Sequence, residues 1–196
     1  MVVPALSHSM PLSLKATLDT VMKELNPPQR LLMGPGPSNV HPRVTQAMGA
    51  PILGHLDPDF LQIMADVREM LRMVFQTSNP ITFPVSGTGT AGMEAILVNL
   101  LEPGDTFVVA INGFFGERLA NIADRCGANV ARVQFPWGNP VEPGPLQLEL
   151  RNHRKIKAVA LVHAETSTGA LTPLSELATL AHEHDALLIV DTVTSL

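Results

Sequence analysis

The sequence contains few of the residues that mark secreted proteins, membrane proteins or nucleic-acid-binding proteins. It has one cysteine, Cys126, so no internal disulfide can form, which is typical of a reducing compartment. Its 13 lysine and arginine residues are outnumbered by 18 acidic residues, and the net charge of −5 gives no general attraction for nucleic acid. No apolar run approaches the ~20 residues of a membrane span, and the N-terminus lacks the pattern of a signal peptide. We therefore expect a cytoplasmic protein with neither a membrane nor nucleic acid as partner.

Charged residues are scarce as well. They make up 16% of the chain, against ~25% in typical soluble domains, whereas 45% of the residues are hydrophobic. The chain therefore has enough apolar residues for a sizeable core. The low charge also indicates that part of the surface is covered in an oligomer.

From residue 81 onward, apolar runs that are typical of strands alternate with segments of helical pattern. The expected strands are residues 81–85, 106–111, 129–135, 157–163 and 187–191. The expected helices between them are residues 88–101, 114–127, 146–154 and 173–185. This alternation predicts an α/β fold with a mostly parallel sheet covered by helices on both faces. Ligands of such sheets bind at the carboxyl ends of the strands.

The first part of the chain has a different pattern. Residues 1–30 are expected to form an N-terminal extended arm with a short amphipathic helix at 12–25, and residues 31–196 the main domain. A longer helix is predicted over 57–76, with Asp57 as its cap. Its apolar face is expected to contain Phe60, Ile63, Met64, Val67, Leu71 and Val74.

The stretch Val85–Leu97 reads VSGTGTAGMEAIL and contains the pattern G-x-G-x-x-G at the start of an expected helix. The N-terminus of a helix offers free N–H groups and the positive end of the helix dipole, so anions bind there. The glycines allow close approach and the hydroxyls add donors, which makes Thr88, Gly89 and Thr90 candidate phosphate-binding residues. The same pattern also suits a dinucleotide-binding loop, or an ordinary strand-to-helix turn capped by threonine.

A dinucleotide site makes a further demand that this sequence does not meet. An acidic residue is expected at the end of the next strand, ~20 residues further on, to bind the ribose hydroxyls. That strand is followed by Asn112 and Gly113, with no carboxylate. An NAD-binding oxidoreductase is therefore the less favoured interpretation.

An acid in another place suits a different phosphate-bearing ligand. Asp191 follows the apolar residues of the last expected strand. A buried carboxylate there would keep the nitrogen of a pyridinium ring protonated and make the ring an electron sink. Phe115 follows another strand and would stack on such a ring. Taken singly, Asp191 also suits a turn or helix cap, and Phe115 an ordinary core residue.

Several motifs together resemble the class V aminotransferases of pyridoxal-phosphate fold type I, and within them the alanine–glyoxylate and the serine–pyruvate or serine–glyoxylate aminotransferases. The motifs are LLMGPGPSNVHPRV at 31–44, GHLDPDF at 54–60, residues 74–105 around SGTGT, NGFFGER at 112–118, HAETSTGALTPL at 163–174 and LLIVDTVTSL at 187–196. They follow the family's order from about residue 30 to residue 196. The resemblance implies that residues 31–196 are the N-terminal part of a large domain that binds pyridoxal 5′-phosphate.

The resemblance assigns the phosphate and the substrate to particular residues. Thr88, Gly89 and Thr90 would bind the phosphate of pyridoxal 5′-phosphate. The backbone around Gly36 would lie near the carboxylate of the substrate. No metal is implied.

The resemblance also assigns the contacts of the cofactor ring. Phe115 would stack on one face of the ring, and Val193 would press on the opposite face. Asp191 would pair with the ring nitrogen, and Thr166 would form a hydrogen bond near the phenolic oxygen.

The family also requires a lysine that this sequence does not supply. That lysine forms the Schiff base with the cofactor and shuttles a proton. The four lysines present are Lys15, Lys23, Lys155 and Lys157, and none is at the family's position. No catalytic residue is therefore assigned. The family's carboxylate-binding arginine and small C-terminal domain are not found either, so we expect the N-terminal half of an enzyme.

The activity implied is the transfer of an amino group from alanine or serine to glyoxylate, giving glycine plus pyruvate or hydroxypyruvate. A homodimer is implied, and relatives are cytoplasmic or peroxisomal. The alternative is a truncated, non-catalytic fragment that keeps the phosphate site and the dimer surface. Other class V chemistry that depends on pyridoxal phosphate, such as cysteine desulfuration, stays open.

Overall fold

The computed structural model of the chain describes residues 27–196. The predicted helix at 12–25 and most of the predicted N-terminal arm lie outside the described residues. The chain divides into two compact units, Met1–Thr45 and Gln46–Leu196. The helix α2 (Pro42–Met48) spans the boundary between them.

In the first unit, the described residues before α2 have no regular secondary structure. They are held by one side chain, Asn39. Its Oδ1 accepts a hydrogen bond from the backbone N–H of Leu32 (2.8 Å), and its Nδ2 donates to the carbonyl oxygen of Arg30 (2.9 Å).

The second unit is built on a parallel sheet in the order β2-β1-β3-β6. Its strands are β1 (Thr106–Ile111), β2 (Asn129–Gln134), β3 (Ala158–Val162) and β6 (Leu187–Asp191). All three pairings are parallel. A small antiparallel hairpin follows β3 and consists of β4 (Ala164–Glu165) and β5 (Ala170–Leu171). The hairpin has no counterpart among the predicted elements.

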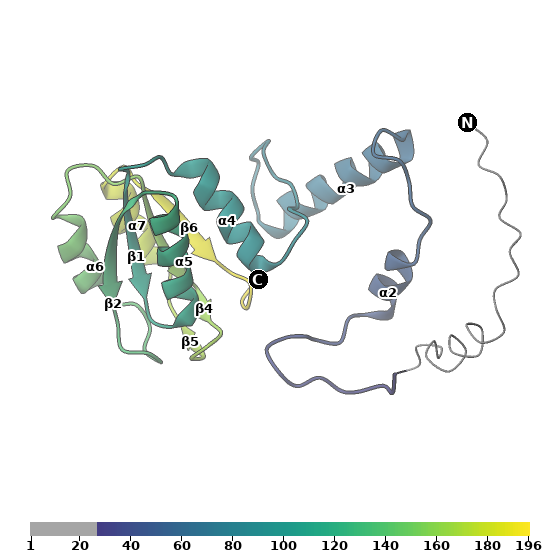
Figure 1. Cartoon of the computed structure of the whole chain (residues 1–196), viewed down its shortest axis with the longest axis horizontal. Coiled ribbons are helices and arrows are strands. Elements are labelled where there is room, and N and C mark those ends of the chain that lie inside the picture. Colours follow the sequence, from purple (N-terminus) through teal and green to yellow (C-terminus); the bar gives the residue numbers. More distant parts are fainter. Residues whose placement is uncertain (1–26) are drawn as a thin grey trace, which may run out of the picture. The chain divides into compact units, whose positions relative to one another are not determined.

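Helices cover both faces of this sheet (Figure 1). On one face, α4 (Gly89–Leu100) and α5 (Phe114–Arg125) pack on Phe107, Val109 and Ile111 of β1. On the other face, α6 (Pro143–Leu150) and α7 (Ser175–Glu183) pack on the alternate residues of the same strand. Successive strand residues point to opposite faces, so continuous apolar strands bury both. The predicted fold class is confirmed.

The long helix α3 (Pro58–Val74) begins as the sequence predicts. Asp57 is its N-cap, and its Oδ1 accepts a hydrogen bond from the backbone N–H of Asp59 at 2.9 Å. The predicted apolar face is not buried, because Ile63 is 50% exposed and Val74 is 58% exposed. None of the described helices is long and apolar enough to cross a membrane.

Two predicted elements are corrected by the structure. Residues 81–85 do not form a strand. Pro84 has no N–H to donate to a sheet, and the carbonyl oxygen of Pro80 just before the segment instead accepts hydrogen bonds from Arg68 and Arg72. The helix predicted over 146–154 begins earlier, at Pro143, and ends at Leu150, since proline suits the first turn of a helix.

The packing of α4 on the sheet leads to a prediction about the stability of the protein. Leu97 is fully buried, whereas its neighbour Val98 is 60% exposed. Replacement of Leu97 by alanine should lower the free energy of unfolding by about 2–5 kcal/mol, through lost burial and a cavity. The control Val98→Ala should change it by less than about 0.5 kcal/mol. Urea unfolding followed by circular dichroism measures both, and equal losses would contradict the packing described.

Candidate functional site

Seven residues from four chain segments line one hollow. It lies at the carboxyl end of the sheet, where the chain leaves β1, β3 and β6. Its lining residues are Gly89, Thr90, Met93, Phe115, Thr166, Asp191 and Val193. Six residues predicted for the site therefore come together. The seventh, Thr88, is adjacent to them as the N-cap of α4.

The N-terminus of α4 presents hydrogen-bond donors to this hollow. The Oγ1 of Thr88 accepts from the backbone N–H of Ala91 (3.3 Å), which satisfies one of the free donors of the first turn. The Oγ1 of Thr90 accepts from Nη1 of Arg118 at 2.7 Å. Because both oxygens accept from the protein, both hydroxyl hydrogens remain able to donate to an anion. The helix dipole favours the same charge.

Arg118 is a member of this group that the sequence did not reveal. Its guanidinium lies over the ring of Phe114 at 4.9 Å and over that of Phe115 at 5.6 Å from each centroid. These cation–π contacts fix the side chain that donates to Thr90. Arg118 follows Phe114 by one turn of α5, and this i, i+4 spacing from an aromatic residue is a signal in the sequence from which the contact could have been predicted.

The opposite side of the hollow is formed by the end of β6. One carboxylate oxygen of Asp191, Oδ1, accepts from the backbone N–H of Val193 (2.9 Å), which fixes the carboxylate in a tight turn. Val193 reaches toward the start of α4. A Cβ at Gly89 would lie 2.9 Å from Cγ2 of Val193, so a larger residue at position 89 would have to displace the side chain of Val193. The glycine thus lets the two loops approach each other closely.

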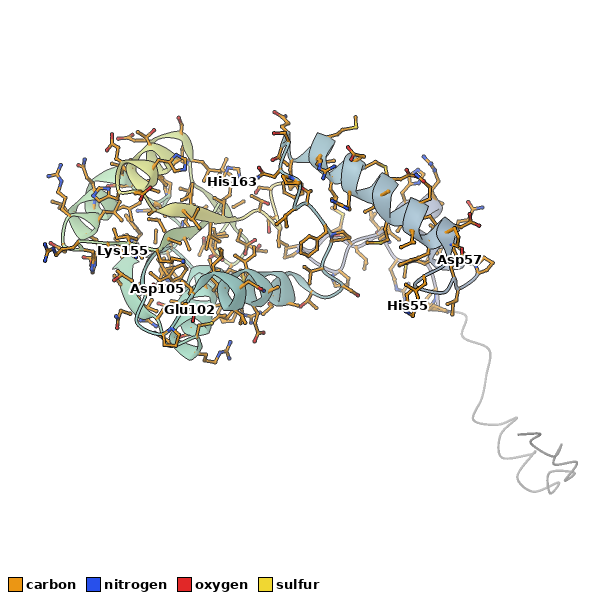
Figure 2. All side chains as sticks on the ribbon, turned by 90° about the horizontal axis from the view of Figure 1, so that it is seen from above. His55, Asp57, Glu102, Asp105, Lys155 and His163 are labelled. Atoms are coloured by element: carbon orange, nitrogen blue, oxygen red, sulfur yellow. The ribbon has the colours of Figure 1, made fainter. Side chains whose placement is uncertain are left out.

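Hydrogen bonds join the segment after β3 to the segment after β6. The hydroxyls of Thr166 and Thr194 are bonded to each other, and Nδ1 of His163 is 2.8 Å from Oγ of Ser195. Figure 2 labels His163, which follows β3 directly. Thr166 is held in the hollow by this arrangement.

The end of β1 offers no acid for a dinucleotide ribose. Asn112 is fully buried, and its Nδ2 donates to the carbonyl oxygen of Asn139 at 2.9 Å. The side chain therefore holds the proline-rich loop against the sheet. This arrangement agrees with the sequence argument against a dinucleotide site.

The remaining predicted residues lie elsewhere. Gly36 belongs to the first unit, so its place near the substrate stays a prediction. Lys155 and Lys157 precede β3, whereas His163 follows it, as Figure 2 shows for Lys155 and His163. The amino group of Lys157 is 4.0 Å from a carboxylate oxygen of Asp105, which precedes β1. The described lysines are thus at the amino ends of the strands, away from the hollow.

Comparison with known proteins gives the family. The model of the class V aminotransferases matches residues 32–196. The chain belongs to the class V aminotransferase family. It is 42% identical over 183 residues to the alanine–glyoxylate aminotransferase of Felis catus, covering 93% of this chain and 44% of that protein. The chain thus spans about half the length of the curated relatives that it matches.

Solved structures agree with this assignment. An alanine–glyoxylate aminotransferase from Nostoc sp. is 51% identical, with a TM-score of 0.85, and the match covers 89% of this chain and 46% of that one. A ureidoglycine–glyoxylate aminotransferase from Bacillus subtilis is 43% identical, also with a TM-score of 0.85, over 88% of this chain and 44% of that one.

The cofactor of this family is pyridoxal 5′-phosphate, and the hollow suits its chemistry. The hydroxyls and N–H groups at the start of α4 match a phosphate. The half-buried carboxylate of Asp191 matches a protonated ring nitrogen, with Phe115 and Val193 as apolar neighbours in the same hollow. The residues that line the hollow are therefore chemically suited to pyridoxal 5′-phosphate.

Arg118 gives the first prediction about ligands. Replacement of Arg118 by methionine should weaken the binding of inorganic phosphate by about ten-fold, because Thr90 loses a charged donor worth about 1.5–3 kcal/mol. Arg125→Met is the matched control, since it removes the same charge from an exposed position of the same helix. Calorimetric titration measures both. Equal weakening by the two variants would mean that only the overall charge of α5 matters.

Proposed function

We propose that these residues are the cofactor-binding part of an aminotransferase that transfers an amino group from alanine or serine to glyoxylate. The products are glycine and either pyruvate or hydroxypyruvate. The observation that carries the proposal is the meeting of six predicted cofactor contacts in one hollow at the carboxyl end of the sheet. Membership of the class V aminotransferase family supports the reaction type.

Each predicted cofactor contact then has one task. Thr88, Gly89 and Thr90 bind the phosphate through hydroxyl and N–H donors at the start of α4. Thr90 is oriented by Arg118, which leaves its hydroxyl hydrogen directed away from the guanidinium. These contacts anchor the cofactor at one end, so its ring is confined to the space between Phe115 and Val193.

The carboxylate of Asp191 would stabilise the positive charge on the nitrogen of the cofactor ring. The cofactor, when bound, draws electrons from the bond that is broken at the substrate's α-carbon into its ring. A carboxylate against the ring nitrogen favours the protonated, electron-withdrawing form of that ring. The hydrogen bond from the backbone N–H of Val193 fixes one oxygen of Asp191 and leaves the other oxygen available to a ligand. Thr166 donates to an oxygen on the ring.

Glyoxylate is the better supported of the two substrates. It appears in the names of the relatives from Felis catus, Nostoc sp. and Bacillus subtilis, whereas their amino donors differ between alanine and ureidoglycine. The acceptor is therefore the constant feature of these relatives. The choice of alanine or serine as donor follows from the motifs of the sequence, with Gly36 beside the substrate carboxylate.

The non-catalytic alternative is favoured by one observation. The described lysines lie at the amino ends of the strands, so neither reaches a ligand at the carboxyl ends. Under this alternative, residues 1–196 bind the cofactor phosphate without turnover.

The partner proposed is a second copy of the protein. Exposed apolar side chains on α3 and α4, such as Ile63, Met73 and Ile96, support a covered surface there. The proposed organisation remains an arm at residues 1–30 followed by the cofactor domain at 31–196, and the proposed location is the cytoplasm.

The proposed activity is tested on the product of the complete reading frame that contains these residues. With glyoxylate and added pyridoxal 5′-phosphate, glycine should form when alanine or serine is the donor, with an equal amount of pyruvate or hydroxypyruvate. If glycine forms with neither donor, the proposed reaction is contradicted. Cofactor binding by residues 1–196 without glycine formation would support the non-catalytic alternative for that chain.

The role of Asp191 gives a second prediction about ligands. Asp191→Asn keeps the size of the side chain but removes its charge, so affinity for pyridoxal 5′-phosphate should fall by about ten-fold while affinity for inorganic phosphate stays within two-fold. Asp185→Asn is the control, because Asp185 is exposed in the turn after α7, where asparagine also tolerates the positive φ of 53°. If both variants bind the cofactor as the unmodified chain does, Asp191 does not contact the ring.

A further inference from the structure

A buried carboxylate that no cofactor contact requires lies behind the hollow. Glu165 is the last residue of β4, and it is fully buried. An isolated buried charge is costly, so its partners explain its presence. Its Oε2 accepts from the backbone N–H groups of Phe115 and Gly116, at 3.2 Å each. Its Oε1 accepts from the backbone N–H of Ser167 (3.1 Å) and from the Ser167 hydroxyl (2.6 Å).

These bonds make Glu165 the cap of α5. The N-cap position of this helix is Gly113, which has no side chain to accept from the first turn. A Cβ at Gly113 would lie 2.3 Å from Cγ and 2.5 Å from Cδ of Glu165. The carboxylate therefore fills the space that an ordinary capping side chain would take. Its negative charge at a helix N-terminus is favoured by the dipole.

Ser167 completes the connection. Its Oγ accepts from the backbone N–H of Phe114 (3.0 Å) while its hydroxyl hydrogen is donated to Glu165. Three consecutive N–H groups of α5, those of Phe114, Phe115 and Gly116, are thus bonded to residues 165 and 167. Thr166 lies between these two residues. The wall of the hollow that contains Phe115 and the wall that contains Thr166 are held together by one carboxylate.

The geometry points to Glu165 as a positioning residue that sets the separation of Phe115 and Thr166 and so the fit of the cofactor ring, while the phosphate contacts on α4 do not depend on it. This inference rests on the proposed function, because it needs pyridoxal 5′-phosphate as the ligand. A positioning role of Glu165 and a merely structural role predict different results. A structural role would change the stability of the whole unit, whereas a positioning role changes the binding of the ring and spares that of the phosphate.

The test compares two ligands on the full chain, pyridoxal 5′-phosphate and inorganic phosphate, by calorimetric titration. Glu165→Gln removes the charge and turns one acceptor into a donor that faces N–H groups. We expect its affinity for pyridoxal 5′-phosphate to fall by about ten-fold and its affinity for phosphate to stay within two-fold. Glu176→Gln, at an exposed site in the first turn of α7, is the matched control and should change neither affinity.

Each outcome of this test supports or overturns the positioning role of Glu165. Unchanged cofactor affinity in folded Glu165→Gln protein, or an equal loss for both ligands, overturns the inference. If circular dichroism shows that this variant does not fold, the milder Ser167→Ala decides instead, with about a three-fold loss expected for the cofactor alone and no loss overturning the inference. Absence of cofactor binding by the unmodified chain overturns the proposed function itself, a result distinct from a failure of Glu165 alone.

Discussion

The parallel pairing of β1, β3 and β6 is the constraint on which the rest of the molecule depends. Because all three strands run in the same direction, their carboxyl ends lie at the same edge of the sheet, and the segments that follow them must meet there. Residues separated by a hundred positions, such as Thr90 and Asp191, thereby line one hollow. Both faces of β1 and β3 are buried under helices, so the register of these two strands cannot slip without exposing apolar side chains.

The close approach of these segments is achieved with glycine and with buried polar groups. Gly89 admits Val193, and Gly113 admits the carboxylate of Glu165. Arg118 is held by two aromatic rings and orients a threonine of α4. The hollow is therefore preorganised by its own contacts, with hydroxyl hydrogens and one carboxylate oxygen left for a ligand. Such preorganisation is what a small charged cofactor needs in order to bind in a single orientation.

Much of this arrangement could be predicted from local patterns. Continuous apolar strands alternating with helices predicted the sheet, and threonine with glycine at the start of α4 predicted an anion site. The segment at 81–85 was misjudged because a β-like composition does not supply a neighbouring strand, and Pro84 lacks a donor. Glu165 was missed because its partners are about 50 positions away. The signal was the absence of any capping side chain before α5, since a helix start without one must find an acceptor elsewhere.

Amide hydrogen exchange, measured by mass spectrometry with and without pyridoxal 5′-phosphate, tests the central claim most directly. The account predicts slower exchange on ligand addition in four segments at the carboxyl edge of the sheet, residues 86–92, 113–118, 163–168 and 191–195. It predicts no change in α6 and α7, which cover the other face of the sheet. Slower exchange confined to other parts of the described chain, or no change anywhere at saturating ligand, would contradict the account.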